Sequence, residues 1–169
     1  ILIIINVIFS YRGINNHDFF DRYKFEVEKI TIYKDYKRLI TGGFLHVGWS
    51  HLIFNMLSLY FFSGGIETML GPLPFLAVYF SSLVGGHLLC LLVFRRQGDY
   101  SGVGASGAIS GVMFASIALF PGMTIMFMPG WVYGLLYVAI SIYGIRSRRD
   151  NIGHEDRGRG VRHYRSARR

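Results

Sequence analysis

Long apolar runs, interrupted by short polar segments, dominate the first 145 residues of the chain. Between Leu39 and Phe94 the only charged residue is Glu67, and there is none between Tyr100 and Ile145. A soluble domain of this size would carry charges on every exposed helix face. Apolar runs of this length therefore predict helices that cross a membrane.

The runs predict five membrane spans, of which the first is incomplete. They cover about residues 1–11, 44–63, 73–94, 103–120 and 123–145. A glycine-rich turn over 64–72 is expected to separate the second and third spans, and Pro129-Gly130 is expected to kink the fifth. The predicted fold class is all-α, a polytopic transmembrane helix bundle.

Two segments of the chain differ from these runs. Residues 12–41 interleave charges of both signs with aromatic side chains, which predicts a segment at the membrane interface. Residues 146–169 hold half of the 18 Lys and Arg residues and no apolar run, which predicts a disordered tail. We therefore expect a membrane domain over 1–145 and a basic tail over 146–169.

The charge and cysteine content narrows the function classes. The net charge of +8 reflects the tail more than the domain, and its basic residues do not form a folded face with aromatic platforms. Contact with solvent or lipid headgroups is thus favoured over nucleic-acid binding. Cys90 is the only cysteine, which excludes a disulfide framework and a cysteine-based metal site.

Three polar residues occur near the start of the second span: His46, His51 and Asn55. His51 and Asn55 are four residues apart, so they share one face of a helix. Polar groups in hydrocarbon are costly unless they are satisfied. Hydrogen bonds between helices would explain any one of them, whereas two on one face favour a functional site.

The stretch GASG places Ser106 at the head of the fourth span. Gly107 and Gly111 belong to a small-residue seam that allows close helix packing, and Gly104 allows backbone to approach a ligand. A serine in the first turn of a helix also lies beside free N–H groups that favour an oxyanion. Spans two and four begin on the same side of the membrane, so Ser106 would lie at the depth of His51. The residues leave both interpretations open, a packing motif and a nucleophile.

Together these motifs resemble the rhomboid intramembrane serine proteases. The pattern HxxxxHxxxN on one span and GxSG at the opening of a later span carry the resemblance. The segment Lys37-Arg38-Leu39 is similar to the aromatic-x-Arg loop segment of the family, and GGIETMLG, with Glu67, to the turn after its second span.

The resemblance implies a six-span bundle that cleaves transmembrane or membrane-proximal segments of partner proteins with a Ser–His dyad. Ser106 would be the nucleophile, and His51 and Asn55 would stabilise the oxyanion together with the Ser106 backbone N–H. His46, Gly104 and Gly107 would support the site. The resemblance implies neither a metal nor another cofactor, and it suggests a multi-pass protein of the bacterial plasma membrane.

The sequence departs from the family pattern at the general base. Family members carry GHxAHLGG on the sixth span, whereas this chain has GHEDRGRG. His154 matches the first histidine, but Arg157 replaces the second, and an arginine cannot act as a base at neutral pH. Three explanations remain open: a damaged or frame-shifted gene, a catalytically inactive protein that binds transmembrane partners, or His154 as a stand-in base.

Overall fold

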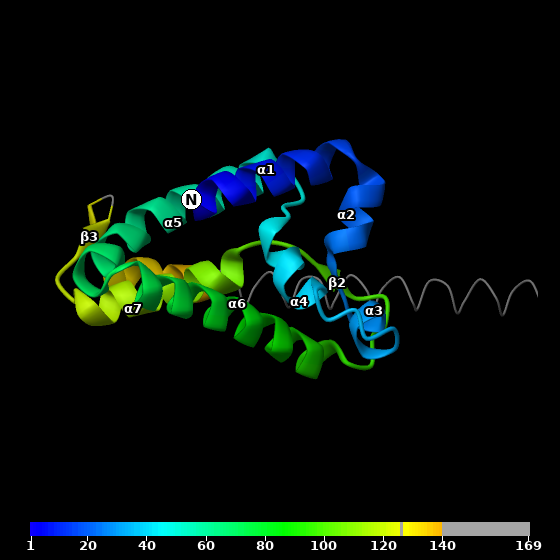
Figure 1. Cartoon of the computed structure of the whole chain (residues 1–169). Coiled ribbons are helices and arrows are strands. Elements are labelled where there is room, and N and C mark those ends of the chain that lie inside the picture. Colours follow the sequence, from blue (N-terminus) through cyan, green and yellow to red (C-terminus); the bar gives the residue numbers. More distant parts are fainter. Residues whose placement is uncertain (126, 140–169) are drawn as a thin grey trace, which may run out of the picture. The chain divides into compact units, whose positions relative to one another are not determined.

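The computed structural model describes residues 1–125 and 127–139, and most of these residues are helical (Figure 1). The predicted all-α class is confirmed. The chain divides into two compact units, Ile1–Pro121 and Gly122–Arg169. The first unit contains the polar residues named above, apart from His154 and Arg157.

The first unit combines four helices of 14 or more residues, α1, α5, α6 and α7, with a series of short elements. In chain order it contains α1 (Leu2–Asn15), α2 (His17–Tyr23), β1 (Phe25–Glu26), α3 (Val27–Thr31), α4 (Arg38–Thr41), the 3-10 helix η1 (Gly42–Phe44), α5 (Trp49–Leu70), α6 (Pro72–Phe94), β2 (Ser101–Gly102) and α7 (Ser106–Leu119). β1 and β2 pair antiparallel, with Phe25 opposite Gly102.

Small residues allow α6 and α7 to pack closely. A Cβ added to Gly107 would lie 3.8 Å from the Cα of Gly86, and one added to Gly111 would overlap the side chain of Ser82. The predicted seam of Gly107 and Gly111 is therefore a helix contact. This contact holds α7 against α6 and so positions Ser106, the first residue of α7.

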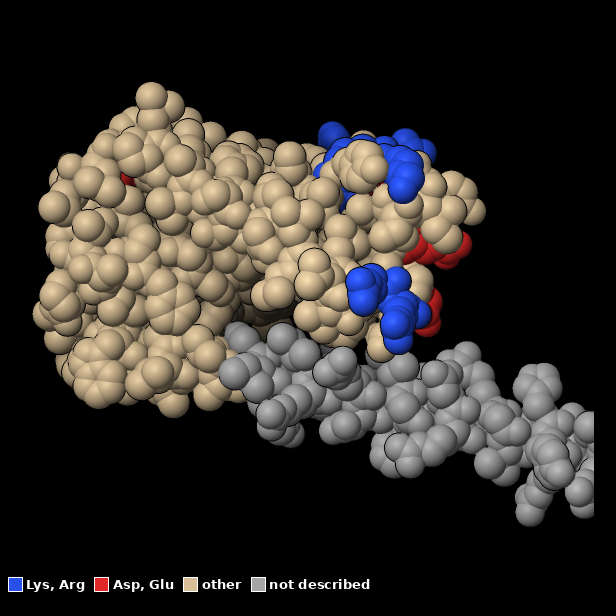
Figure 2. Space-filling model, turned by 90° about the horizontal axis from the view of Figure 1, so that it is seen from below, with Lys and Arg blue, Asp and Glu red and all other residues tan. Residues whose placement is uncertain are grey.

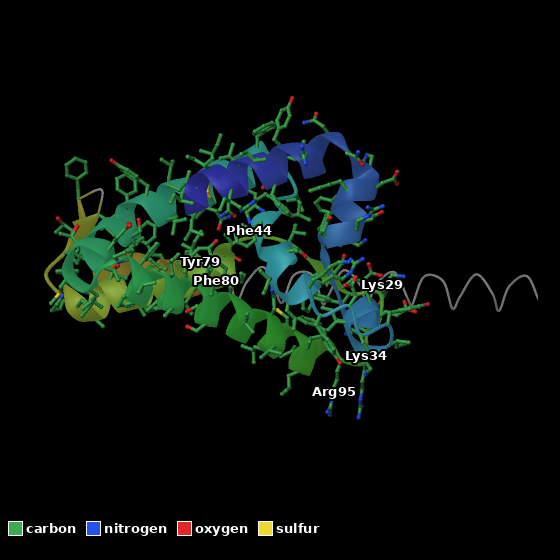
Figure 3. The ribbon with its side chains drawn as sticks, viewed as in Figure 1. Lys29, Lys34, Phe44, Tyr79, Phe80 and Arg95 are labelled. Carbon is green, nitrogen blue, oxygen red and sulfur yellow. The ribbon has the colours of Figure 1, made fainter. Side chains whose placement is uncertain are left out.

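Buried polar and aromatic side chains attach α1 to the rest of the first unit. Asn6, which is fully buried, donates from Nδ2 to the Tyr79 hydroxyl at 3.3 Å. The rings of Phe44 and Tyr79 lie 6.4 Å apart, as do those of Phe44 and Phe80, and the three are labelled in Figure 3. These contacts connect α1, η1 and α6.

Charged side chains gather at one end of the face drawn in Figure 2, and a broad uncharged area adjoins them. Lys29, Lys34 and Arg95 belong to this charged end (Figure 3). By contrast, exposed side chains of α6 are apolar: Leu89 is 64% exposed and Leu92 72% exposed. This distribution is typical of a protein whose helices face lipid and whose loops face water.

The second predicted span begins and ends later than expected. α5 starts at Trp49, not at Phe44. Residues 45–48 are not helical, and Gly48 is fully extended. It then continues through Gly64 and Gly65 to Leu70, where a turn had been expected. Gly65 faces the ring of Phe120, since an added Cβ would lie 2.9 Å from its Cε2. Packing against Phe120, the residue that follows α7, therefore outweighs the low helix propensity of glycine.

The second unit departs from the predicted fifth span. β3 (Thr124–Ile125) and β4 (Met128–Pro129) form an antiparallel pair, and a helix covers Gly130–Ala139. The expectation of a helix that starts at Met123 and kinks at Pro129-Gly130 is wrong. A residue that precedes proline is disfavoured in helical conformation, so the helix starts after Pro129.

By length and composition, α6 is the one described helix that could cross a membrane, with 23 residues and a mean hydropathy of 2.0 over its best window. α1, α7 and the helix Gly130–Ala139 are apolar but shorter. The count of five visible spans stays a prediction. The predicted tail, residues 146–169, lies outside the described residues.

Candidate active site

The two predicted histidines lie on either side of the start of α5. His46 is in the connection before the helix and is fully buried, and His51 is in the first turn. Their rings meet edge to face with centroids 4.9 Å apart. Asn55, one turn further along, is 3% exposed and donates from Nδ2 to the His51 carbonyl oxygen at 2.8 Å. The predicted shared face of His51 and Asn55 is thus present on α5.

The loop before α7 lies directly against His51. Gly104 has φ +128°, a conformation that side-chain-bearing residues rarely adopt, and its N–H donates to the Gly42 carbonyl at 3.0 Å. A Cβ on Gly104 would lie 2.8 Å from Cε1 and 3.1 Å from Nε2 of His51. Only glycine at this position lets the GASG backbone approach the imidazole so closely.

Ser106 is the first residue of α7 and is exposed, whereas Gly104 and Ala105 before it are buried. No side chain caps this helix end. The first N–H groups of an α-helix have no partner within the helix, and the dipole places partial positive charge there. The start of α7 therefore suits negative charge that develops near Ser106.

Ser10, which the motifs did not predict, also contacts the site. Ser10 of α1 is fully buried, and its Oγ lies 2.8 Å from Nδ1 of His46. Its hydroxyl also donates to the Phe44 carbonyl at 3.0 Å. A signal was available, because Asn6 and Ser10 repeat the four-residue polar spacing of His51 and Asn55 within an apolar run.

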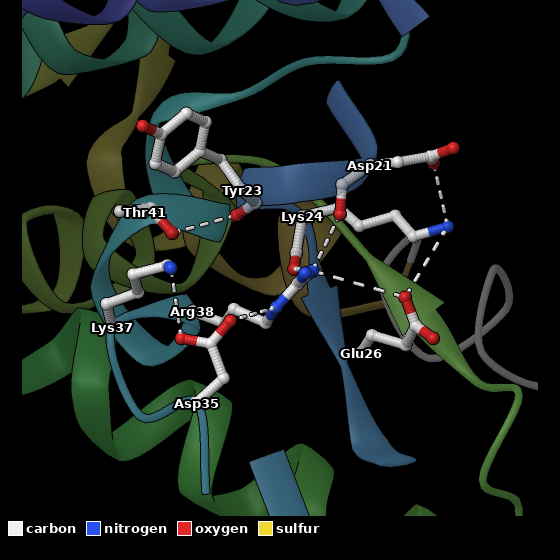
Figure 4. Close-up of polar contacts among 8 residues, drawn as sticks. All are labelled: Asp21, Tyr23, Lys24, Glu26, Asp35, Lys37, Arg38 and Thr41. Atoms are coloured by element: carbon white, nitrogen blue, oxygen red, sulfur yellow. Dashed lines mark hydrogen bonds and ion pairs between the residues drawn. The ribbon is translucent and has the colours of Figure 1, made fainter. Parts of the chain in front are cut away.

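A buried arginine holds the segment that leads to Gly42 (Figure 4). Arg38 is 6% exposed and donates from Nη1 to the carbonyl oxygens of Asp21 and Lys24, each at 2.8 Å. Its Nε donates to Oδ2 of Asp35 at 2.9 Å. These bonds join the end of α2 to the start of α4, and α4 runs directly into η1 and Gly42.

The same contacts set the charge state of Asp35. Desolvation alone would raise the pKa of this carboxyl. Hydrogen bonds from Arg38 and Lys37, and the positive charges of both, outweigh it and hold the pKa below its usual value of 3.8. Asp35 therefore remains ionised in the folded segment to a lower pH than in an unfolded chain.

The structure brings most of the predicted site residues into one region. His46, His51, Asn55 and Gly104 are connected by the contacts above, Ser106 follows two residues after Gly104, and Gly107 packs on α6. His154 and Arg157 lie outside the described residues. Within the described part of the chain, no cluster of three His, Cys, Asp or Glu could hold a metal ion.

Comparison with known proteins identifies the family of the chain. The model of the Rhomboid domain family matches residues 33–154, which is more than half of the chain and includes the predicted site residues. The chain belongs to the rhomboid family. The resemblance inferred from the motifs is confirmed. Rhomboid proteins are integral membrane proteins, and the family includes intramembrane serine proteases.

Individual rhomboid relatives come from bacteria and from mitochondria. YdcA of Bacillus subtilis is 44% identical over 75 residues, covering 44% of this chain and 37% of its own length. Rhomboid protein 1, mitochondrial, of Saccharomyces cerevisiae is 32% identical over 139 residues, covering 75% of this chain and 40% of its own. The rhomboid protease GluP of Bacillus subtilis is 32% identical over 120 residues, covering 69% and 23%. The chain thus spans less than half the length of these relatives.

Proposed function

We propose that this rhomboid chain is a serine endopeptidase that cleaves transmembrane or membrane-proximal segments of other proteins, with Ser106 as the nucleophile. The contact that carries the proposal is the approach of Gly104 to the His51 imidazole. It brings the loop that opens α7 against the face of α5 that also holds Asn55. Membership of a family that includes named proteases supports the same reaction class.

In the proposed reaction, Ser106 Oγ attacks the carbonyl carbon of the scissile peptide, and its proton passes to a base. The carbonyl oxygen becomes an oxyanion, which would be stabilised by His51, Asn55 and the Ser106 backbone N–H. Collapse of this intermediate breaks the C–N bond, and the amine leaves with the proton from the base. Water, which gives a proton to the same base, then attacks the acyl carbon. The bond from this carbon to Ser106 Oγ breaks, the carboxylic acid product leaves, and Oγ regains a proton from the base.

Reaction with a fluorophosphonate probe tests the nucleophile. We expect the wild-type protein to be labelled on Ser106, and Ser106→Ala to lose the label. Ser110→Ala is the matched control, because Ser110 lies one turn further on α7 and its hydroxyl donates to the Ser106 carbonyl at 2.7 Å. This variant should keep the label. Equal labelling of wild type and Ser106→Ala would refute the assignment of Ser106.

The general base is proposed to be His154, which matches the first histidine of the GHxAHLGG pattern. The test compares peptide cleavage by His154→Ala with cleavage by His163→Ala, a change of a histidine in the same basic segment. Loss of cleavage in the first variant alone supports His154. Unchanged cleavage in both variants would assign the proton transfer to another group.

Arg157 favours a second candidate, a catalytically inactive rhomboid protein that binds transmembrane partners. This candidate predicts that a transmembrane segment co-purifies with the chain in mild detergent, is not cleaved, and stays bound to Ser106→Ala. Cleavage of that segment by the wild type would exclude it.

The membrane in which the protein resides is also part of the proposal. The bacterial relatives YdcA and GluP support a bacterial plasma membrane. The yeast relative is named as mitochondrial, so mitochondria are the competing location. Fractionation of the source organism distinguishes the two.

A further inference from the structure

The hydrogen bonds of Ser10 determine how its single hydroxyl proton is shared. Ser10 Oγ lies 3.0 Å from the Phe44 carbonyl oxygen and 2.8 Å from Nδ1 of His46. The carbonyl can only accept, so the Ser10 proton points to it. If the proton pointed to His46 instead, two oxygen acceptors would face each other at 3.0 Å without a hydrogen between them.

The remaining contact then fixes the proton of His46. With its own proton directed to Phe44, Ser10 Oγ can act toward His46 only as an acceptor, so Nδ1 carries a hydrogen. The other ring nitrogen, Nε2, is buried and has no hydrogen-bond partner among the described residues. A proton on Nε2 would leave a buried donor unsatisfied and would charge the ring, which is the costlier alternative. The chain of bonds therefore favours neutral His46 with Nδ1–H and an unprotonated Nε2.

We propose that Ser10 is a positioning residue of the active site, which acts by holding His46 in the Nδ1–H tautomer and in a fixed ring orientation against His51. The proposal rests on the proposed function, since it assigns His51 to the oxyanion site. The His46 ring meets that of His51 edge to face with centroids 4.9 Å apart.

The neutral tautomer has a direct consequence for His51. A hydrogen-bond donor to an oxyanion carries partial positive charge, and a second positive ring at this distance would repel it. The buried Nε2, which has no hydrogen-bond partner among the described residues, keeps His46 uncharged, and Ser10 accepts the one N–H hydrogen of the neutral ring. Its contact with Phe44 also ties the pair to η1, which directly follows α4.

Nitrogen NMR of histidine-labelled protein tests the tautomer without any need for activity. Protonated and unprotonated ring nitrogens have separate ¹⁵N resonances, and the spectrum of His46→Gln assigns the His46 signals. We expect protonated Nδ1 and unprotonated Nε2 in the wild type. Ser10→Ala should shift the population toward the Nε2–H form, which free histidine prefers, and Ser10→Thr should retain the wild-type tautomer.

Ser116→Ala is the matched control for this experiment. Ser116 is also a buried serine, 1% exposed, whose hydroxyl joins two helices by donating to the Phe62 carbonyl. Its loss should leave the His46 tautomer unchanged. A protonated Nε2 in the wild type, or a Ser10→Ala spectrum identical to that of the wild type, would overturn the proposal. If Ser10→Ala does not fold, the wild-type and Ser10→Thr spectra still show whether His46 carries its proton on Nδ1.

The rate of fluorophosphonate reaction at Ser106 gives the functional readout. We expect Ser10→Ala to react about tenfold more slowly, as for the loss of one buried hydrogen bond, and Ser10→Thr to recover the rate. Ser116→Ala should react at the wild-type rate. Equal rates in Ser10→Ala and wild type would refute the role of Ser10 as a positioning residue. If no variant reacts, including the wild type, the proposed function fails, while the NMR spectrum still decides the tautomer.

Discussion

Gly104 is the residue on which the contact between the GASG loop and His51 depends. Its φ of +128° and its approach to the imidazole both exclude a side chain. The sequence indicated that glycine here allows close backbone approach, but not which group it would meet. That His51 is the neighbour follows from packing between residues far apart in the chain, which no local pattern encodes.

Gly104→Ala should therefore lower the free energy of unfolding by about 1–3 kcal/mol, because alanine is strained at this φ and its Cβ meets the His51 ring. The same change should slow labelling of Ser106. Gly102→Ala is the control, since a Cβ there meets nothing within 4 Å. Reversible unfolding in mixed micelles measures the difference. Similar losses in both variants would contradict the proposed role of the contact.

The lowered pKa of Asp35 predicts how the stability of the folded chain depends on pH. Because its pKa in the folded chain is below 3.8, its contribution to stability is complete above pH 3.8 and is lost as the pH falls through the lower folded value. An NMR titration of the carboxyl should place its midpoint below 3.8. Arg38→Gln should raise that midpoint. A midpoint above 3.8 in the wild type, or no change in the variant, would contradict the assigned contacts.

At the level of elements, helix ends that local residues determine could be predicted, whereas helix ends that tertiary contacts determine could not. The third predicted span, 73–94, agrees with α6 because Gly71-Pro72 starts it and polar residues follow Phe94. The start of α5 could not be predicted, since the connection before it is held by contacts from α1. The spacing of Asn6 and Ser10 signalled a polar face on α1, but tertiary packing determines that His46 is the partner of Ser10.

The contact between α6 and α7 gives a prediction at this scale. Gly111→Ala should destabilise the protein by about 1–3 kcal/mol, because the added methyl overlaps the Ser82 side chain. Ser82→Gly in the same chain should recover most of the loss. Gly64→Ala is the control, as its Cβ would meet nothing within 4 Å. Unfolding free energies of the single and double variants measure the coupling, and additive effects would contradict the packing.

For the whole molecule, rhomboid membership and the apolar surface of α6 predict that this helix lies in lipid. Side chains of α6 that are exposed in the isolated chain should then be shielded from water by the bilayer. Leu89, at 64% exposed, should face lipid, whereas Lys34, at the charged end, should face water.

Cysteine labelling measures this difference in a Cys90→Ser background. A membrane-impermeant maleimide should react quickly with Lys34→Cys in permeabilised vesicles and slowly with Leu89→Cys. Both should react after the bilayer is dissolved in detergent. Comparable rates for the two in the permeabilised vesicles, before detergent is added, would contradict the placement of α6 in lipid.

The most direct test of the proposed function is cleavage of a transmembrane substrate by the purified chain in liposomes. We predict that the wild type produces a discrete fragment whose new ends lie in or near the membrane segment, and that Ser106→Ala produces none while Ser110→Ala still does. Cleavage by Ser106→Ala at the wild-type rate, or no cleavage of any transmembrane substrate by the wild type, would contradict the account.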